Sequence, residues 1–196
     1  GSLSCNVSEN CDNGGDDDLD GLIDCDDSEC QPGEFVDSNQ ALGNNNSLGV
    51  ALGDLDGDGD LDAWAANEGQ GNRVWINDGL GNFSDSGLAL GNSSSRRLAL
   101  GDIDGDGDLD AWVINQINQS NRVWINDGLG SFFDSGQAIG NSYSTGIGLG
   151  DVDGDGDLDA WVANYIQPNR IWINDGLGNF TDSGQALGNS RSFDVS

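Results

Sequence analysis

Short apolar segments alternate with loops rich in Asp, Asn and Gly along most of the chain, from about residue 48 onward. Each apolar segment has the length and the β-branched or aromatic content of a strand. The first group of segments predicts four strands, at Leu48–Leu52, Leu61–Ala66, Arg73–Ile76 and Phe83–Leu90. No segment sustains a 3.6-residue period, so we expect helices to be almost absent.

This group of strands belongs to a repeat. The segment Gly53–Trp64 recurs as Gly101–Trp112 and as Gly150–Trp161, with periods of 48 residues (102 − 54) and 49 residues (151 − 102). Four short strands in each repeat of this length are typical of a β-propeller blade. The sequence therefore predicts an all-β, β-propeller-type fold with three full four-stranded blades.

Partial repeats flank the three full ones. Phe35–Gly43 resembles the fourth strand of the later repeats, and Asn189–Ser196 resembles the start of another first strand. A propeller closes with about four to eight blades, so three and a fraction do not close alone. We expect either further repeats in a longer parent chain or self-association, head to tail or in a ring, through open strand edges. The repeat domain is predicted at residues 35–196.

Two Trp residues recur in every repeat, one in the second strand and one in the third. A Trp platform for stacking sugars is one interpretation, and a core between neighbouring blades is the favoured one. The residues are Trp64, Trp75, Trp112, Trp124, Trp161 and Trp172.

The loop after each first strand is acidic, with the sequence Asp-x-Asp-Gly-Asp-Gly-Asp-Leu-Asp. Five carboxylates in nine residues repel one another unless a hard cation neutralises them. The spacing resembles that of an EF-hand loop, with ligands at positions 1, 3, 5 and 9, a backbone carbonyl at position 7 and Gly at position 6. Calcium is favoured over magnesium, which keeps more of its waters, and over a merely solvated acidic turn. The predicted ligands are Asp54, Asp56, Asp58, Asp60 and Asp62; Asp102, Asp104, Asp106, Asp108 and Asp110; and Asp151, Asp153, Asp155, Asp157 and Asp159.

All four cysteines, Cys5, Cys11, Cys25 and Cys30, lie in the first thirty residues. They lack the paired C-x-x-C spacing of a zinc site, and carboxylates crowd them, so two disulfides are favoured. Three pairings remain open. Disulfides imply a location outside the cytoplasm, and residues 1–34 are predicted as a separate small module stabilised by disulfides and a cation.

Another acidic loop lies between these cysteines, with a carbonyl at position 7 and Gly at position 6. We expect it to bind a further calcium ion, so that the chain binds about four ions in all. Its predicted ligands are Asp16, Asp18, Asp20, Leu22 and Asp24.

Charge and composition narrow the possible functions. The 35 acidic residues exceed the 6 basic ones by 29, which disfavours nucleic acids and anionic lipids as partners. The chain has no His, so a Ser-His-Asp or Cys-His nucleophile system is excluded. No apolar run has the length of a membrane span. We expect a protein that is not an enzyme.

The acidic loop, repeated at this period and followed by a Trp/Ile strand, resembles the FG-GAP/VCBS repeat family. That family includes the calcium-binding blades of integrin α-subunit propellers and many secreted bacterial proteins. The chain departs from the Phe-Gly and Gly-Ala-Pro signatures at Leu90–Gly91 and Ala66–Asn67, which favours the bacterial variety. The N-terminal acidic loop is similar to thrombospondin type 3 repeats.

The resemblance implies a secreted or cell-surface protein, of bacterial type, with a calcium-stabilised structural or adhesive role. Extracellular proteins or glycans are the expected partners. Two other functions remain open: a calcium-dependent lectin, since related propellers bind sugars between blades, and an accessory module of a polysaccharide-degrading enzyme.

Overall fold

The computed structural model describes residues 37–188 and 191–193 of the 196-residue chain. The chain divides into two units, Gly1–Gln40 and Ala41–Ser196. The predicted Cys/Asp-rich module at 1–34, with its disulfides, lies outside the described residues and stays a prediction.

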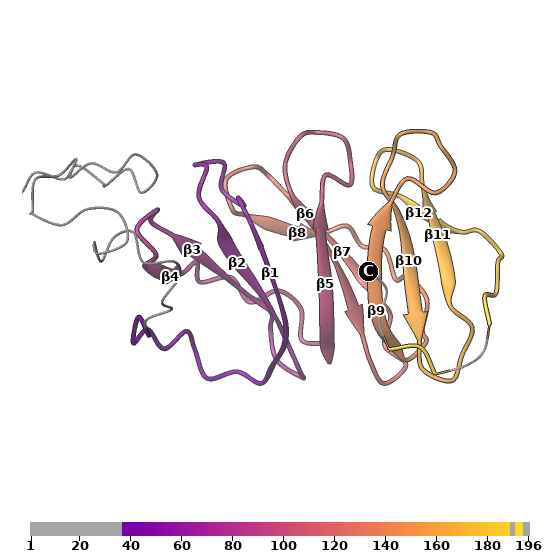
Figure 1. The fold of residues 1–196 in the computed structure, drawn as a ribbon, viewed down its shortest axis with the longest axis horizontal. Coiled ribbons are helices and arrows are strands. Elements are labelled where there is room, and N and C mark those ends of the chain that lie inside the picture. Colours follow the sequence, from indigo (N-terminus) through magenta and orange to yellow (C-terminus); the bar gives the residue numbers. More distant parts are fainter. Residues whose placement is uncertain (1–36, 189–190, 194–196) are drawn as a thin grey trace, which may run out of the picture. The chain divides into compact units, whose positions relative to one another are not determined.

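Three four-stranded antiparallel sheets form the second unit, one for each predicted repeat (Figure 1), and the described residues contain no helix. We call each sheet a blade. The first blade contains β1 (Ser47–Gly53), β2 (Asp62–Asn67), β3 (Arg73–Asn77) and β4 (Phe83–Asp85). The second contains β5 (Ser95–Gly101), β6 (Asp110–Asn115), β7 (Arg122–Asn126) and β8 (Phe132–Asp134). The third contains β9 (Ser144–Gly150), β10 (Asp159–Asn164), β11 (Arg170–Asn174) and β12 (Phe180–Asp182). The predicted all-β repeat fold is confirmed.

The pairing within a blade follows chain order, because each strand joins the next through a short loop. In the first blade, Gly53 pairs with Asp62 across the acidic loop, and Trp64 pairs with both Ala51 and Val74. The loop between the third and fourth strands turns at Gly79, whose φ of 74° is in the left-handed region that suits glycine.

The fourth strand is shorter than the sequence predicts. We expected it to span Phe83–Leu90, but β4 ends at Asp85. The amide of Gly87 donates a hydrogen bond to Oδ1 of Asp85, and Gly87 has a φ of 81°, so a tight turn interrupts the extended backbone. Leu90 then pairs with Asn72 through an isolated bridge.

The blades lie side by side, with the first strand of the middle blade, β5, between β1 and β9 (Figure 1). The first strand of each blade runs toward its acidic loop, and the second returns from it. All three acidic loops therefore lie along one edge of the array, which we call the acidic rim. The opposite edge, where the third strands begin, is the far rim.

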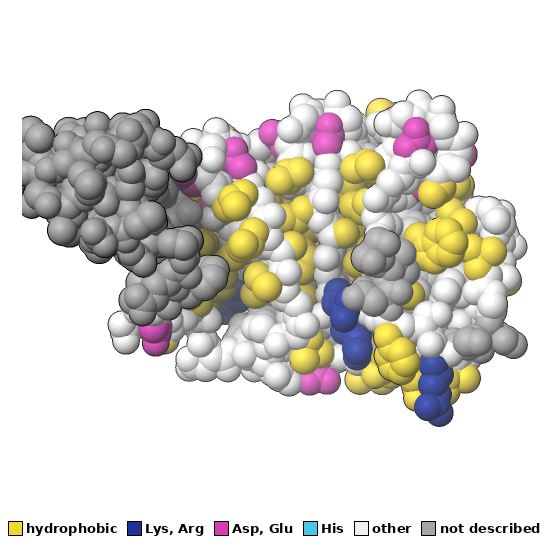
Figure 2. Space-filling view, in the orientation of Figure 1, with side chains coloured by type: hydrophobic (Ala, Val, Ile, Leu, Met, Phe, Trp, Pro, Cys, Tyr) yellow, Lys and Arg dark blue, Asp and Glu magenta, His cyan; other side chains and the backbone are white. Residues whose placement is uncertain are grey.

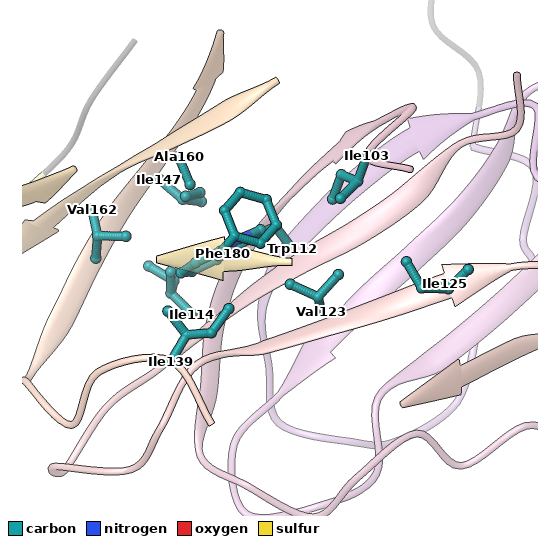
Figure 3. Close-up of a cluster of buried hydrophobic side chains, with 10 residues drawn as sticks. All are labelled: Ile103, Trp112, Ile114, Val123, Ile125, Ile139, Ile147, Ala160, Val162 and Phe180. Carbon is teal, nitrogen blue, oxygen red and sulfur yellow. The ribbon is translucent and has the colours of Figure 1, made fainter. Parts of the chain in front are cut away.

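The hydrophobic core lies between neighbouring blades. Figure 3 shows the cluster between the second and third blades, where Trp112 meets Phe180 edge to face, with ring centroids 6.0 Å apart. Between the first and second blades, Trp64 meets Phe132 in the same way at 4.5 Å. Aromatic pairs of this geometry stabilise cores beyond the area they bury.

The predicted interblade role of the Trp residues is confirmed where the neighbouring blade is present: the second-strand Trp packs toward the following blade, and the third-strand Trp packs toward the preceding one. Trp64 and Trp112 are fully buried and Trp124 nearly so, and Trp172 packs against the cluster between the second and third blades. Trp75 and Trp161 are half-buried.

The flanking partial repeats are described only in part. Residues 37–43 form no strand, and the predicted strand start at 35–36 lies outside the described residues. At the other end, Arg191 pairs with Tyr165 through an isolated bridge. In the described part of the chain, no helix has the length and apolar character needed to cross a membrane.

Candidate metal centres

The three acidic loops have nearly the same internal structure. At position 1, Asp54 accepts hydrogen bonds from the amides of Gly57 (2.8 Å) and Gly59 (3.0 Å). At position 5, Asp58 accepts one from the amide of Asp60 at 2.9 Å. The second and third loops repeat the bonds from Gly105 to Asp102 and from Gly154 to Asp151. The Asp side chains thus hold the backbone of their own loop in a curve around the carboxylates.

Three carboxylates converge in each loop, with one oxygen from each within 4.8 Å of the others. Calcium binds oxygen ligands at about 2.3–2.6 Å, so ligands around one ion lie up to about 5 Å apart. The donor set is entirely oxygen, which suits a hard cation. The converging groups are Asp54, Asp56 and Asp58; Asp102, Asp104 and Asp110; and Asp151, Asp153 and Asp159.

Figure 2 shows acidic side chains at intervals along its upper edge, which is the acidic rim, so the three candidate centres lie on the same side of the molecule. The first two loops lie against the following blade. In the third loop, Asp151 and Asp153 are exposed, whereas their counterparts Asp54, Asp56, Asp102 and Asp104 are half-buried.

The position-9 carboxylate has a structural role that the sequence did not reveal. Asp110 is fully buried, and its two oxygens accept hydrogen bonds from the amides of Asn126 (2.8 Å) and Ile103 (2.9 Å). Asp62 and Asp159 make the equivalent bonds. This carboxylate therefore ties the acidic loop to the end of the third strand, and each oxygen retains lone pairs for a cation.

Burial and the charges of neighbouring carboxylates raise the pKa values of some of the loop carboxyls. Burial, the main cause, raises the pKa of Asp110 to about 6 despite its two amide donors. Burial, followed by the nearby charges of Asp62 and Asp58, also raises the pKa of Asp56. Asp104 shifts the same way, again mainly through burial. A bound cation stabilises the ionised form of such groups and opposes these shifts.

Position 7 was predicted to contribute a backbone carbonyl, and that prediction stays open. The side chain of Asp60 turns away toward the Asp-Gly turn of its own blade, where a side chain on Gly79 would collide with its carboxylate. Asp108 and Asp157 contact Gly128 and Gly176 in the same way.

The first two acidic loops each accept a hydrogen bond from the following blade. The side-chain amide of Asn126 donates a 2.9 Å hydrogen bond to the carbonyl of Leu55, at position 2 of the preceding loop. Asn174 donates the equivalent 2.7 Å bond to Ile103. A Cβ on Gly57 would lie 3.2 Å from the carbonyl oxygen of Gly128, so the turn of the second blade lies directly on the first loop. The repeated Asn of the Trp-Ile-Asn-Asp-Gly segment was the only sequence signal for this contact.

A polar pocket recurs beside the third-strand Trp of each blade. In the third blade it has a volume of about 130 Å³ and is lined by Trp172, Arg170, Asn164, Asn121 and Ser144, among others. Smaller versions of about 10 Å³ lie beside Trp124 and Trp75.

The predicted N-terminal centre at Asp16, Asp18, Asp20, Leu22 and Asp24, and the cysteines Cys5, Cys11, Cys25 and Cys30, lie outside the described residues.

Blades joined through Trp-Phe contacts, each with an acidic loop on the same rim, define a repeat protein of the propeller-blade class. The family model of the FG-GAP-like repeat matches residues 54–113 and 102–162, which together cover 109 of the 196 residues. The chain therefore belongs to the FG-GAP-like repeat family. None of the curated proteins compared with the chain matches it.

Proposed function

We propose that this protein is a calcium-binding repeat protein with a structural or adhesive role outside the cytoplasm, at a cell surface or in an extracellular assembly. The observation that carries the proposal is the convergence of three carboxylates in each acidic loop. Because the first two loops also contact the following blade, a cation in each of them would hold neighbouring blades together.

Calcium suits these loops better than magnesium. A cation in the second loop would be held by Asp102, Asp104 and Asp110, with Asp106 and the carbonyl of Asp108 as further ligands. Such a ligand-rich set fits the six to eight oxygens that calcium takes, whereas magnesium keeps several waters. Extracellular modules bind calcium with Kd of about 0.1–1 mM, so the proposed setting supplies enough of it.

A non-catalytic role is part of the proposal. The converging carboxylates of the described residues belong to the three acidic loops, where their proposed task is to hold a cation. The cysteine-rich N-terminus supports an oxidising, extracytoplasmic location, of the kind expected for a secreted bacterial protein.

Calcium titration by isothermal calorimetry tests the metal assignment. We expect about four ions for the full chain, three in the described loops and one at the N-terminus. Asp104→Ala should remove one ion. Asp134→Ala is the matched control, because Asp134 lies outside the loops and pairs with Arg122 at 3.7 Å. A chain that takes up no calcium at millimolar concentration would refute the proposal.

Carbohydrate binding is the second candidate function, favoured by the polar pocket beside Trp172. Trp, Arg, Asn and Ser side chains offer a stacking surface and hydrogen-bond partners for a sugar. A glycan array tests this candidate: binding of a sugar that Trp172→Ala abolishes while calcium uptake persists would establish a lectin. An accessory module of a polysaccharide-degrading enzyme is a further candidate, and polysaccharide binding in the same assay would support it.

A further inference from the structure

Neighbouring blades meet through a contact that occurs twice among the described residues. A methyl group placed on Gly53 would lie 2.7 Å from Cδ1 of Leu109 and 3.0 Å from Cδ1 of Leu100. Gly101 stands in the same relation to Leu158 and Leu149 of the third blade. Each interface therefore joins the glycine that ends one first strand to two leucines of the next blade.

The first blade presents the leucine side of this contact to solvent. Val50, Leu52 and Leu61, which we call the leading patch, are 65%, 58% and 56% exposed. Their counterparts in the second blade, Leu98, Leu100 and Leu109, are half-buried and pack against the core cluster shared with the first blade.

The third blade presents the opposite side. Val152 is 49% exposed, whereas its counterparts Leu55 and Ile103 are 0% and 1% exposed beneath the next blade. A Cβ on Gly150 would meet nothing within 4 Å. Trp161 is only half-buried. Gly150, Val152 and Trp161 form the trailing patch.

We propose that the trailing patch docks the leading patch of a second copy of this chain, head to tail. The two patches are the unmatched halves of an interface that the molecule already makes twice. In the docked pair, Leu61 and Leu52 would lie against Gly150, as Leu109 and Leu100 lie against Gly53. The side-chain amide of Asn77, the counterpart of Asn126, would donate to the carbonyl of Val152.

Blade faces, rather than strand edges, thus mediate this association. Such a contact is heterologous, and it closes into a ring or continues as a filament depending on the rotation between copies. Two copies supply 2 × 3 = 6 blades, within the roughly four to eight of closed propellers. Repulsion between two strongly acidic chains opposes docking, and salt at physiological strength screens it beyond about 8 Å.

Sedimentation velocity of the full chain, up to about 100 µM and with millimolar calcium, tests the proposal. We expect a concentration-dependent dimer. Val152→Glu and Leu61→Glu should each weaken association at least about tenfold, since both bury a charge in an apolar contact. Leu129→Glu is the matched control. Leu129 is 76% exposed in the middle blade and belongs to neither patch, so this variant should associate as the native chain does.

Mixing the two variants separates a head-to-tail contact from any other. Val152→Glu keeps an intact leading patch and Leu61→Glu an intact trailing patch, so the mixture should form a heterodimer through one interface. A native chain that stays monomeric across the whole range would overturn the proposal, as would variants that associate like the control or fail to complement each other. A separate measurement of calcium uptake distinguishes a failure of self-association from a failure of the calcium-binding proposal.

Discussion

Asn126 in the second blade and Leu55 in the first are joined by a 2.9 Å hydrogen bond across 71 residues of sequence. The donor is the last residue of β7, and the acceptor is the carbonyl at position 2 of an acidic loop. The same side chain also donates to Leu109 of its own blade at 3.2 Å. One side-chain amide thus links the acidic loop of one blade to the next blade.

Replacing Asn126 with Ala should lower the free energy of unfolding by about 1–3 kcal/mol, because it leaves the buried Leu55 carbonyl without a donor. Urea unfolding of dilute protein in calcium measures the effect. Asn77→Ala is the control, since Asn77 donates only within its own blade, to Leu61 at 3.2 Å. Equal losses for the two variants would contradict the interblade role.

Gly57→Ala should destabilise the protein more than Gly154→Ala does. Both glycines have positive φ, 79° and 88°, so both variants incur backbone strain of about 1–2 kcal/mol. Only Gly57 also faces a neighbouring blade, with the carbonyl of Gly128 3.2 Å from the position of the new Cβ. The difference between their melting temperatures therefore isolates the contact between blades. A larger loss at Gly154 would argue against it.

Removal of calcium should unfold or greatly loosen the protein. With about 2 mM calcium and a Kd of about 0.1 mM, each site adds about 1.8 kcal/mol, and four independent sites add about 7 kcal/mol. That total is comparable to the stability of an ordinary domain. Thermal unfolding with and without excess chelator checks this prediction, and an unchanged melting temperature after complete removal of the ions would refute it.

Among the ligands of the first loop, Asp56→Ala should reduce this calcium-dependent stabilisation more than Asp60→Ala. The Asp56 carboxylate converges with those of Asp54 and Asp58, whereas the Asp60 side chain points toward Gly79. Calcium titration followed by melting compares the two variants directly. A greater loss with Asp60→Ala would reverse the assignment of the ligands.

Without metal, the protein should become more stable as the pH falls from about 7 toward about 4.5. The raised pKa of Asp110, about 6 against an ordinary 3.8, means that the folded chain binds this proton more tightly than the unfolded chain does. Its contribution is complete below 3.8 and is lost as the pH rises through about 6.

Calcium should reverse this trend, because protons compete with the cation for the same oxygens. The lowered pKa values of Asp78 and Asp175, each held down mainly by the side chain of a neighbouring Asn, matter only at more acidic pH. Melting temperatures measured across this range in chelator and in calcium test both directions. A metal-free protein that loses stability on mild acidification would contradict the expectation.

The first three strands of each blade and the acidic loops could be predicted from sequence because their signals are local. Apolar alternation and the Asn-Asp-Gly turn placed β1, β2 and β3 to within one residue. The fourth strand was predicted too long, because Gly87 ends it through its own backbone conformation and not through any change in hydrophobic pattern.

Features that depend on contacts between distant positions could not be predicted. Asp62, Asp110 and Asp159 have the same spacing as the other loop carboxylates, and only the folded structure shows that they are buried and tie the loop to the third strand of their own blade. Leu55 and Val152 hold equivalent positions in the repeat, yet one is buried and the other is half exposed. That difference arises because the second blade covers Leu55, whereas no blade in the described residues covers Val152. The residue pattern of the repeat does not encode this difference.

The two rims differ in charge. The acidic loops lie on one rim, while the arginines lie toward the other, where Asp85, Asp134 and Asp182 pair with Arg73, Arg122 and Arg170 at 3.8, 3.7 and 3.6 Å. The remaining arginines are Arg96, Arg97 and Arg191. Because the three blades share one orientation, their charge separations add, and the repeat domain has a permanent dipole along its strands. Transient electric birefringence would detect such a moment and its decrease when cations neutralise the loops. Near a positively charged surface the molecule would therefore orient with its acidic rim foremost before any specific contact forms.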